Sequence, residues 1–386
     1  MIDGDGQHLT FQRLSEAQFE KIKPEWDALH ATSDQSVFTS WCWMYAWWQV
    51  FKEEDFELFL VACRSGERLV AILPFYIASR PFLKFFSLRT LYFLGYKGEG
   101  EAGYRAEYLD FVCSSRDAQT LRAPLMQYLL SGAGAGVDEG AGVDEIVLSD
   151  VPATELHGSV LTALKKQGAA YIRETARDQT YRIDLMAGYD VFLNGLGKGT
   201  RTRIKGSEKR MANEVSFSVK HRSLDAPEAL LGPIKELHAL RWNNQKSFNA
   251  YQVFLEFLLR IDAGGDLELS GVQLEHNEEI AAATLNLSYG GVVYNLMLGF
   301  KEVPVKRVSL GLLALGLDIQ NCSAQSGLAC YDLLAGSGKR TDYKSNIASK
   351  GPELVSHQIL LSWLPRMVYR LYDRLLKTKK DAEASF

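Results

Sequence analysis

The sequence LGFKEVPVKRVSLGLLAL, residues 298–315, joins an apolar strand pattern to an apolar helix pattern, and it decides how the rest of the chain is interpreted. Residues 311–320 carry apolar side chains almost all round a helix, which predicts a buried helix. A further strand pattern follows at 328–334. Short strand patterns separated by polar turns precede the segment and predict a meander; they are residues 267–274, 280–287 and 292–298.

The start of the predicted helix has the features of an anion-binding site. The first amides of a helix have no partner inside it, and the helix dipole favours an anion there. Ser309 is a good N-cap residue, and Gly311 leaves room for a ligand beside the backbone. Lys306 and Arg307 add positive charge just upstream. The pattern therefore predicts either a pyrophosphate site or a capped core helix with solvated basic residues.

The segment 298–315, together with YDLLAGSGKRTDYKSNIA at 331–348, resembles the cellulose-biosynthesis-associated (CelD-like) branch of the GNAT acyltransferases. That branch has Gly-Phe, an Arg-x-Ser-x-Gly-like turn, an apolar helix, an Asp near a strand, a Gly and Tyr-Lys. The matching residues here are Gly299, Phe300, Arg307, Ser309, Gly311, Asp332, Gly336, Tyr343 and Lys344. Leu310 departs from the Pro often found between the Ser and the Gly, and the resemblance is sharpest over residues 181–350.

The resemblance implies an acyl-CoA, acetyl-CoA or longer, as co-substrate between two splayed strands, and no metal. It makes Tyr343 the candidate proton donor to a departing thiolate. Asp332 is the candidate base, or it orients Tyr343 or Lys344; it is equally interpreted as a strand-end carboxylate paired with Lys344. The residues implied to contact the acyl-CoA are Leu298, Gly299, Phe300, Lys306, Arg307, Ser309, Leu310 and Gly311.

Composition narrows the class of protein. The chain has 386 residues, 47% of them hydrophobic and 23% charged, as expected of a folded soluble protein of two or three domains. A net charge of −4 argues against a polyanion-binding molecule as a whole. The five cysteines show neither metal spacing nor a disulfide framework, and the acidic N-terminus lacks a signal-peptide pattern. We therefore expect a cytoplasmic protein.

Two pairs of similar segments suggest tandem domains. VACRSGERLVA at 61–71 aligns without gaps with VQLEHNEEIAA at 272–282, and FLGYK at 93–97 aligns with MLGFK at 297–301. We expect a mixed α/β fold of two GNAT-like domains, each with a central mixed sheet flanked by helices. The expected divisions are a degenerate domain at 8–178, the acyltransferase domain at 179–352 and a basic amphipathic helix at 353–386.

Two basic segments carry the predictions about partners. KGTRTRIKGSEKR, residues 198–210, is either a solvated helix face or an anchor for an anionic substrate. Arg203 within it and Arg241 further on are candidate acceptor-binding residues, the latter because it resembles an arginine that recurs there in relatives. Residues 359–380 place leucines on one side and basic residues opposite. That segment either packs across the domains or lies on an anionic membrane surface.

These expectations describe an acyl-CoA-dependent N- or O-acyltransferase. Its acceptor would be a small molecule or a glycan or lipid precursor in cell-surface polysaccharide or lipid biosynthesis, with no nucleic acid involved. A Fem-type transferase that uses aminoacyl-tRNA is one alternative, with residues 198–210 as the tRNA contact. The other alternative is a non-catalytic scaffold, a degenerate GNAT pair held at the inner face of the membrane by its C-terminal helix.

Overall fold

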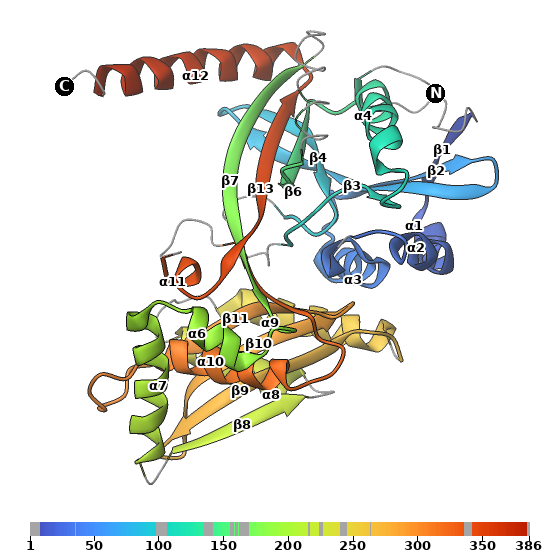
Figure 1. Cartoon of the computed structure of the whole chain (residues 1–386). Helices are drawn as coiled ribbons and strands as arrows, with labels where there is room; N and C mark the ends of the chain where they lie inside the picture. Colours follow the sequence, from blue (N-terminus) through green and yellow to red (C-terminus); the bar gives the residue numbers. More distant parts are fainter. Residues whose placement is uncertain are drawn as a thin grey trace. The chain divides into compact units, whose positions relative to one another are not determined.

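The structure is a computed structural model. It describes residues 8–34, 36–97, 106–134, 142–154, 158, 161, 170–214, 217–223, 227–239, 245–262, 264–335 and 342–383. These residues divide into two compact units. Unit 1 holds the described residues up to Arg177 and those from Leu354 onward, and unit 2 holds those of Asp178–Glu353. Each unit has a mixed sheet flanked by helices (Figure 1), so the expected mixed α/β fold is confirmed.

Unit 1 is built on the strand order β1-β2-β3-β4-β6-β13-β7, with β5 paired to β3. The first four strands form an antiparallel meander, and β4 then pairs with β6 in parallel. Its elements are β1 (Leu9–Leu14), α1 (Glu16–Lys21), α2 (Lys23–His30), a 3-10 turn (Val37–Thr39), α3 (Trp41–Phe51), β2 (Glu57–Ser65), β3 (Arg68–Phe82), β4 (Phe86–Phe93), β5 (Val112–Cys113), α4 (Ala118–Gly134), β6 (Glu145–Pro152), part of β7 (Tyr171–Asp184), part of β13 (Ser349–Leu360) and α12 (Trp363–Glu383).

The helix α3 lies in the core of unit 1. Four of its tryptophans are at most 4% exposed, so the aromatic spacing of this segment marks packing and not an open ligand wall. Trp43 stacks edge-on against Phe38 at 4.7 Å between ring centroids, and Trp47 lies 5.2 Å from Tyr76 of β3. The helix begins at Ser40, whose hydroxyl accepts a hydrogen bond from the Trp43 N–H.

Unit 2 is built on the strand order β7-β12-β11-β10-β9-β8. The predicted meander is confirmed as β9, β10 and β11, and β11 then pairs with β12 in parallel. The elements of unit 2 are the second half of β7, α6 (Tyr189–Gly195), α7 (Lys198–Ala212), β8 (Phe217–Ser223), α8 (Pro227–Ala239), α9 (Gln245–Ile261), β9 (Glu268–His276), β10 (Glu279–Tyr289), β11 (Val292–Phe300), α10 (Leu310–Ser323), β12 (Cys330–Ala335) and α11 (Asp342–Ser345).

The prediction that 353–386 is one helix is wrong. Leu354–Leu360 belongs to β13 and pairs with β6 across a register shift between Val355 and His357, so this stretch is a strand and not part of a helix. The helix itself, α12, begins at Trp363. No helix in the described ranges combines the length and the hydrophobicity needed to cross a membrane.

Both units contain a short parallel strand pair. In unit 1, Thr90–Tyr92 of β4 pairs with Glu145–Val147 of β6. In unit 2, Val292–Tyr294 of β11 pairs with Cys330–Asp332 of β12. The hairpins β2–β3 and β9–β10 contain the two similar segments found in the sequence. The same arrangement is therefore present twice, and only its surroundings differ.

Candidate active site

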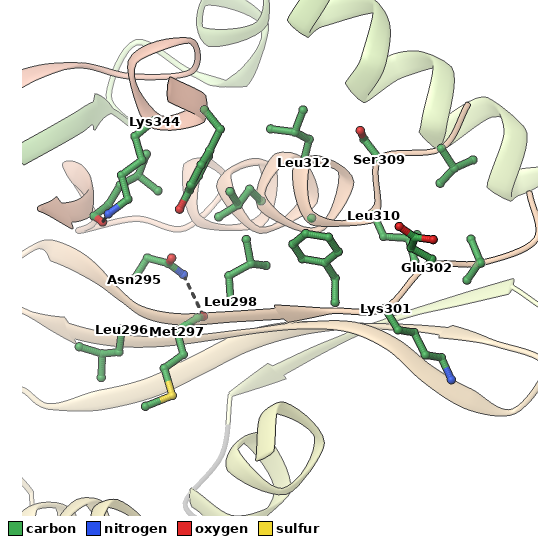
Figure 2. Close-up of a pocket in the computed structure, with 17 residues that line it drawn as sticks. Asn295, Leu296, Met297, Leu298, Lys301, Glu302, Ser309, Leu310, Leu312 and Lys344 are labelled. Carbon is green, nitrogen blue, oxygen red and sulfur yellow. Dashed lines mark hydrogen bonds between the residues drawn. The ribbon is translucent and has the colours of Figure 1, made fainter. Parts of the chain in front are cut away.

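A cavity of about 1190 Å³ opens in unit 2 at the place where β11 and β12 separate. Among the described residues, the parallel pairing of these strands ends at Tyr294 and Asp332. The cavity begins at the next residue of β11, Asn295, and follows the strand to its end (Figure 2). The rest of the lining comes from the loop before α10, from α10 itself, from Leu333 of β12 and from two residues of α11. Two splayed strands therefore bound the site, as the resemblance implied.

A bulge in β11 shapes the floor of the cavity. Asn295 and Met297 lie opposite the consecutive β10 residues Asn286 and Leu285, so Leu296 is the extra residue. A bulge bends its strand and changes where the following side chains point. In Figure 2, Asn295 and Leu298 point toward α10 and Met297 points away from it.

The start of α10 lies at one end of the cavity. Ser309 occupies the N-cap position as predicted, but its side chain makes no capping hydrogen bond. Its N–H donates instead to the Ser207 hydroxyl of α7 at 2.9 Å. A Cβ at Gly311 would lie 2.9 Å from the Phe300 ring. The missing side chain of Gly311 therefore makes room for Phe300, and Gly311 also lines the cavity, so the approach of a ligand to its backbone stays a prediction.

The basic residues before α10 lie outside the cavity wall. Lys306 and Arg307 are exposed, and neither is among the described residues that line the cavity. Arg307 has a φ of 64°, and its carbonyl accepts a hydrogen bond from Arg210 of α7 at 3.1 Å. The loop is thus fixed to α7 at Ser207 and at Arg210.

The helix α7 has a buried side and a basic exposed side. Ile204, Ser207 and Met211 are buried, and a Cβ at Gly316 of α10 would lie 2.9 Å from Ile204. Arg203 is exposed and does not line the cavity. Arg241 and Gly336 lie outside the described residues. The spacing of the three buried residues is the signal that sequence reasoning passed over at this helix.

Asp332 and Lys344 both hold the end of β12. Asp332 is fully buried; one carboxylate oxygen accepts from the Leu334 N–H and the other from Arg182 Nε, each at 2.7 Å. Lys344 Nζ donates to the carbonyls of Leu333, Leu334 and Ala335 at 2.7, 3.2 and 3.0 Å. Leu334 needs this support, because its φ of 61° is in the left-handed region. Arg182 is a partner that the sequence analysis did not name.

Tyr343 precedes Lys344 on the short helix α11 and lines the cavity. It also packs against the hydrophobic core formed by β7, α10 and β12. Burial raises the pKa of its phenol, so the hydroxyl keeps its proton at neutral pH. The packing of its ring holds Tyr343 in place, and Lys344 beside it ties the short helix to the end of β12.

A buried polar network connects the cavity floor to α10. The side-chain amide Nδ2 of Asn295 donates to Asn286 Oδ1 at 2.9 Å, and Asn286 Nδ2 donates to the Asp318 carboxylate at 2.8 Å. The Tyr331 hydroxyl donates to the same Asp318 oxygen at 2.7 Å. Burial raises the pKa of Asp318. Sequence reasoning missed this network, because its members come from four separate elements.

The corresponding place in unit 1 is filled. A cavity of only about 10 Å³ lies between Phe93, at the end of β4, and Leu148 of β6. Phe111 lines it, and Arg122 beside it makes a bidentate bond to Asp110 at 2.6 and 2.5 Å. Unit 2 therefore has the open site and unit 1 a packed counterpart.

Among the described residues, no three His, Cys, Asp or Glu side chains gather as a metal site. None of the curated proteins compared with this sequence matches it. Residues 198–345 match the family model described as an acetyltransferase (GNAT) domain.

Solved structures resemble the chain over almost its whole length. FemX has a TM-score of 0.58 at 10% identity, over 94% of this chain and 99% of that one. A tandem GNAT protein from the clavulanic acid biosynthesis pathway has a TM-score of 0.53 at 12% identity, over 92% and 99%. A conserved protein of unknown function from Bacteroides thetaiotaomicron VPI-5482 has a TM-score of 0.52 at 11% identity, over 92% and 100%. Identities this low show the fold alone.

The residues that line the open cavity all fall within the matched range. The family match and the tandem structures thus agree with the duplicated strand pair and with the open cavity in unit 2. Residues 198–345 are therefore similar to the acetyltransferase (GNAT) domain, within a chain whose fold resembles that of a tandem GNAT protein.

Proposed function

We propose that the protein transfers an acyl group from an acyl-CoA to an amine or hydroxyl, and that the unit 2 cavity binds the acyl-CoA. The observation that supports this proposal is a cavity between the splayed strands β11 and β12, one end of which lies at the start of α10. Ser309 lies at one end of the cavity and Lys344 at the other (Figure 2). An elongated ligand with an anionic end and a reactive end matches this layout.

The residues present fit an acyl-CoA. The cavity of about 1190 Å³ is larger than the ~300–1,000 Å³ of common small-molecule sites. Leu298, Leu312 and Leu315 give it apolar walls. The first amides of the 14-residue helix α10 favour a phosphate, and Lys306 and Arg307 lie just upstream.

The chemistry needs a polarised carbonyl and a proton for the leaving thiolate. When bound, an acyl-CoA supplies the activated acyl group. Leu298 and Phe300 line the cavity, and the backbone of Leu298–Phe300 polarises a carbonyl placed beside it. The Tyr343 hydroxyl donates the proton. We assign Asp332 and Lys344 a positioning role, because both hold the backbone around Leu334 and so hold α11.

The acceptor and the pathway are also proposals. The Tyr-Lys and Arg-x-Ser-x-Gly residues support the cellulose-biosynthesis-associated branch and an acceptor from cell-surface polysaccharide or lipid synthesis. The basic side of α7, where Arg203, Lys205 and Lys209 are exposed, favours a second candidate, a Fem-type transfer from aminoacyl-tRNA. In that case binding would weaken steeply with salt concentration.

The test is thermal stability against CoA, acetyl-CoA, longer acyl-CoAs and aminoacyl-tRNA. A ligand at ~100 times its Kd stabilises by about 2.7 kcal/mol. We expect the wild type to be stabilised by an acyl-CoA and Arg307→Glu to lose most of the shift, since the charge next to the phosphate site is reversed. Arg260→Glu, an exposed arginine on α9, is the matched control and should keep the shift.

A shift with aminoacyl-tRNA alone would replace the acyl-CoA proposal by the Fem-type one. If none of these ligands raises the melting temperature, both transferase proposals fail and the non-catalytic scaffold is the alternative that is left.

A further inference from the structure

The helix α12 packs on unit 1 through polar side chains. Arg173 donates to both carboxylate oxygens of Asp373 at 2.7 Å, and its guanidinium lies 4.4 Å from the centroid of the Tyr369 ring. The hydroxyl of Tyr369 accepts from Arg80 at 3.2 Å, and Tyr171 donates to Asp373 at 2.9 Å. The hydrogen bond from Arg173 lowers the pKa of Asp373, so this anchor stays charged at neutral pH.

The apolar side of α12 faces outward. Trp363 and Leu375 are each 71% exposed, Leu371 is 53% exposed and Met367 is 48% exposed. Residues four apart lie on one side of a helix, so these four form a continuous stripe over more than three turns. A surface helix of a globular protein normally buries its apolar side. The orientation of α12 is the reverse of that rule, and such an exposed stripe marks a contact surface.

The β3–β4 turn also exposes apolar side chains. Leu83 and Phe86 are each 56% exposed, and Phe85 is 83% exposed. The turn is adjacent to α12, because the Phe82 ring lies 5.8 Å from the ring of Tyr369. Tyr369 is on the side of α12 that packs on unit 1, so we call only the stripe of Trp363, Met367, Leu371 and Leu375 the α12 face.

Positive charge accompanies the apolar stripe. Arg366, Arg370 and Arg374 recur every four residues along α12, and the last two are exposed. Between Trp363 and Leu375 the one acidic residue is Asp373, which Arg173 holds. An apolar stripe flanked by arginines complements an anionic interface, and aromatic rings such as Trp363 suit the boundary between headgroups and acyl chains.

We propose that the α12 face binds the surface of a membrane that contains anionic phospholipids. The apolar stripe enters the outer part of the leaflet, and the arginines contact the lipid phosphates. This inference rests on unit 1 and does not depend on the acyl-transfer proposal. Removing residues 353–386 is not a suitable test, because that would also remove the strand β13 from the sheet.

The experiment is co-sedimentation of the full chain with vesicles. We expect the wild type to sediment with vesicles of equal parts phosphatidylglycerol and phosphatidylcholine, and far less with phosphatidylcholine alone. The double variant Leu371→Ser, Leu375→Ser should lower the partition coefficient ~100-fold, because two apolar side chains are lost from the contact. Val253→Ser, which changes a side chain that is also 53% exposed but lies on α9, should bind like the wild type.

Two further measurements test the contribution of the arginines to binding and the insertion of Trp363 into the bilayer. Arg370→Gln with Arg374→Gln should lower binding to the anionic vesicles by about 5-fold per arginine. Brominated lipids should quench Trp363, and Trp363→Phe should remove that quenching, since five other tryptophans are buried in unit 1.

The proposal is overturned if the wild type binds neither vesicle, or if the leucine double variant binds as well as the wild type. It is also overturned if the leucine variant abolishes a dimer of the wild type, in sedimentation velocity, while neither protein binds vesicles. In that case a second copy of the chain covers the face.

Discussion

Replacing Lys344 by Met tests whether this lysine holds the site together or takes part in the chemistry. Lys344 is 8% exposed, and its ammonium group donates to the carbonyls of Leu333, Leu334 and Ala335. A hydrogen bond to a charged group contributes about 1.5–3 kcal/mol net. The three bonds share one donor group, and they are offset by the desolvation and the side-chain entropy of the lysine. We therefore expect Lys344→Met to lower the free energy of unfolding by about 3 kcal/mol.

The matched control is Lys301→Met, since Lys301 also lines the cavity. Its partner Glu279 is 74% exposed, and an exposed ion pair contributes under ~1 kcal/mol. For a unit of this size about 1 kcal/mol corresponds to ~2–4 °C in Tm, so Lys344→Met should melt about 6–12 °C lower and the control within a few degrees.

Urea unfolding and turnover should be measured on the same samples. If Lys344→Met is as stable as the control and yet inactive, the lysine acts chemically and the positioning role is refuted.

Three further predictions concern side chains that line the site or lie near it. Tyr343→Phe should lower kcat ~100-fold with little change in KM or Tm, because a general acid is lost; full turnover in steady-state kinetics would remove Tyr343 from the mechanism. Burial raises the pKa of Asp318 in the folded protein above its unfolded value of about 3.9. Protonated Asp318 therefore stabilises the fold below about pH 3.9, and this stabilisation is lost as the pH rises through the folded pKa. Asp318→Asn should flatten this dependence in urea unfolding measured across pH, and an unchanged slope would contradict it. Burial raises the pKa of Cys330 to about 11, so at pH 8 about one thiol in a thousand is ionised and its reaction with a thiol reagent should accelerate on unfolding; equal rates in the folded and unfolded protein would show that the thiol is not protected.

The elements around the site could be predicted because they are encoded locally. The apolar residues of β9–β11 recur as in strands and those of α10 as in a buried helix, so the type of each element can be predicted from the sequence. The observed boundaries agree with the predicted ones within a few residues. Within residues 108–113 only Val112–Cys113 is a strand, since Tyr108 has a φ of 56° that interrupts an extended backbone.

The details of the site could not be predicted, because they depend on pairing between distant segments. Arg182 reaches Asp332 across 150 positions, and Asn286 meets Asp318 across 32. The contact between Phe300 and Gly311 could not be predicted for the same reason, since only the fold brings the Phe300 ring beside Gly311. The catalytic and acyl-CoA residues as a set remain predictions.

The return of β13 to unit 1 affects the order in which the protein is completed during synthesis. Leu354–Leu360 pairs with Glu145–Pro152 of β6, whereas unit 2 is one continuous segment between them. At ~5–20 residues per second, the roughly 200 residues between the two strands take about 10–40 s to translate. During that interval unit 2 emerges whole, while β6 waits on the ribosome with an open edge able to pair wrongly. We expect the nascent chain to be most prone to aggregation in this window, and the unit that is translated first to be the last to fold.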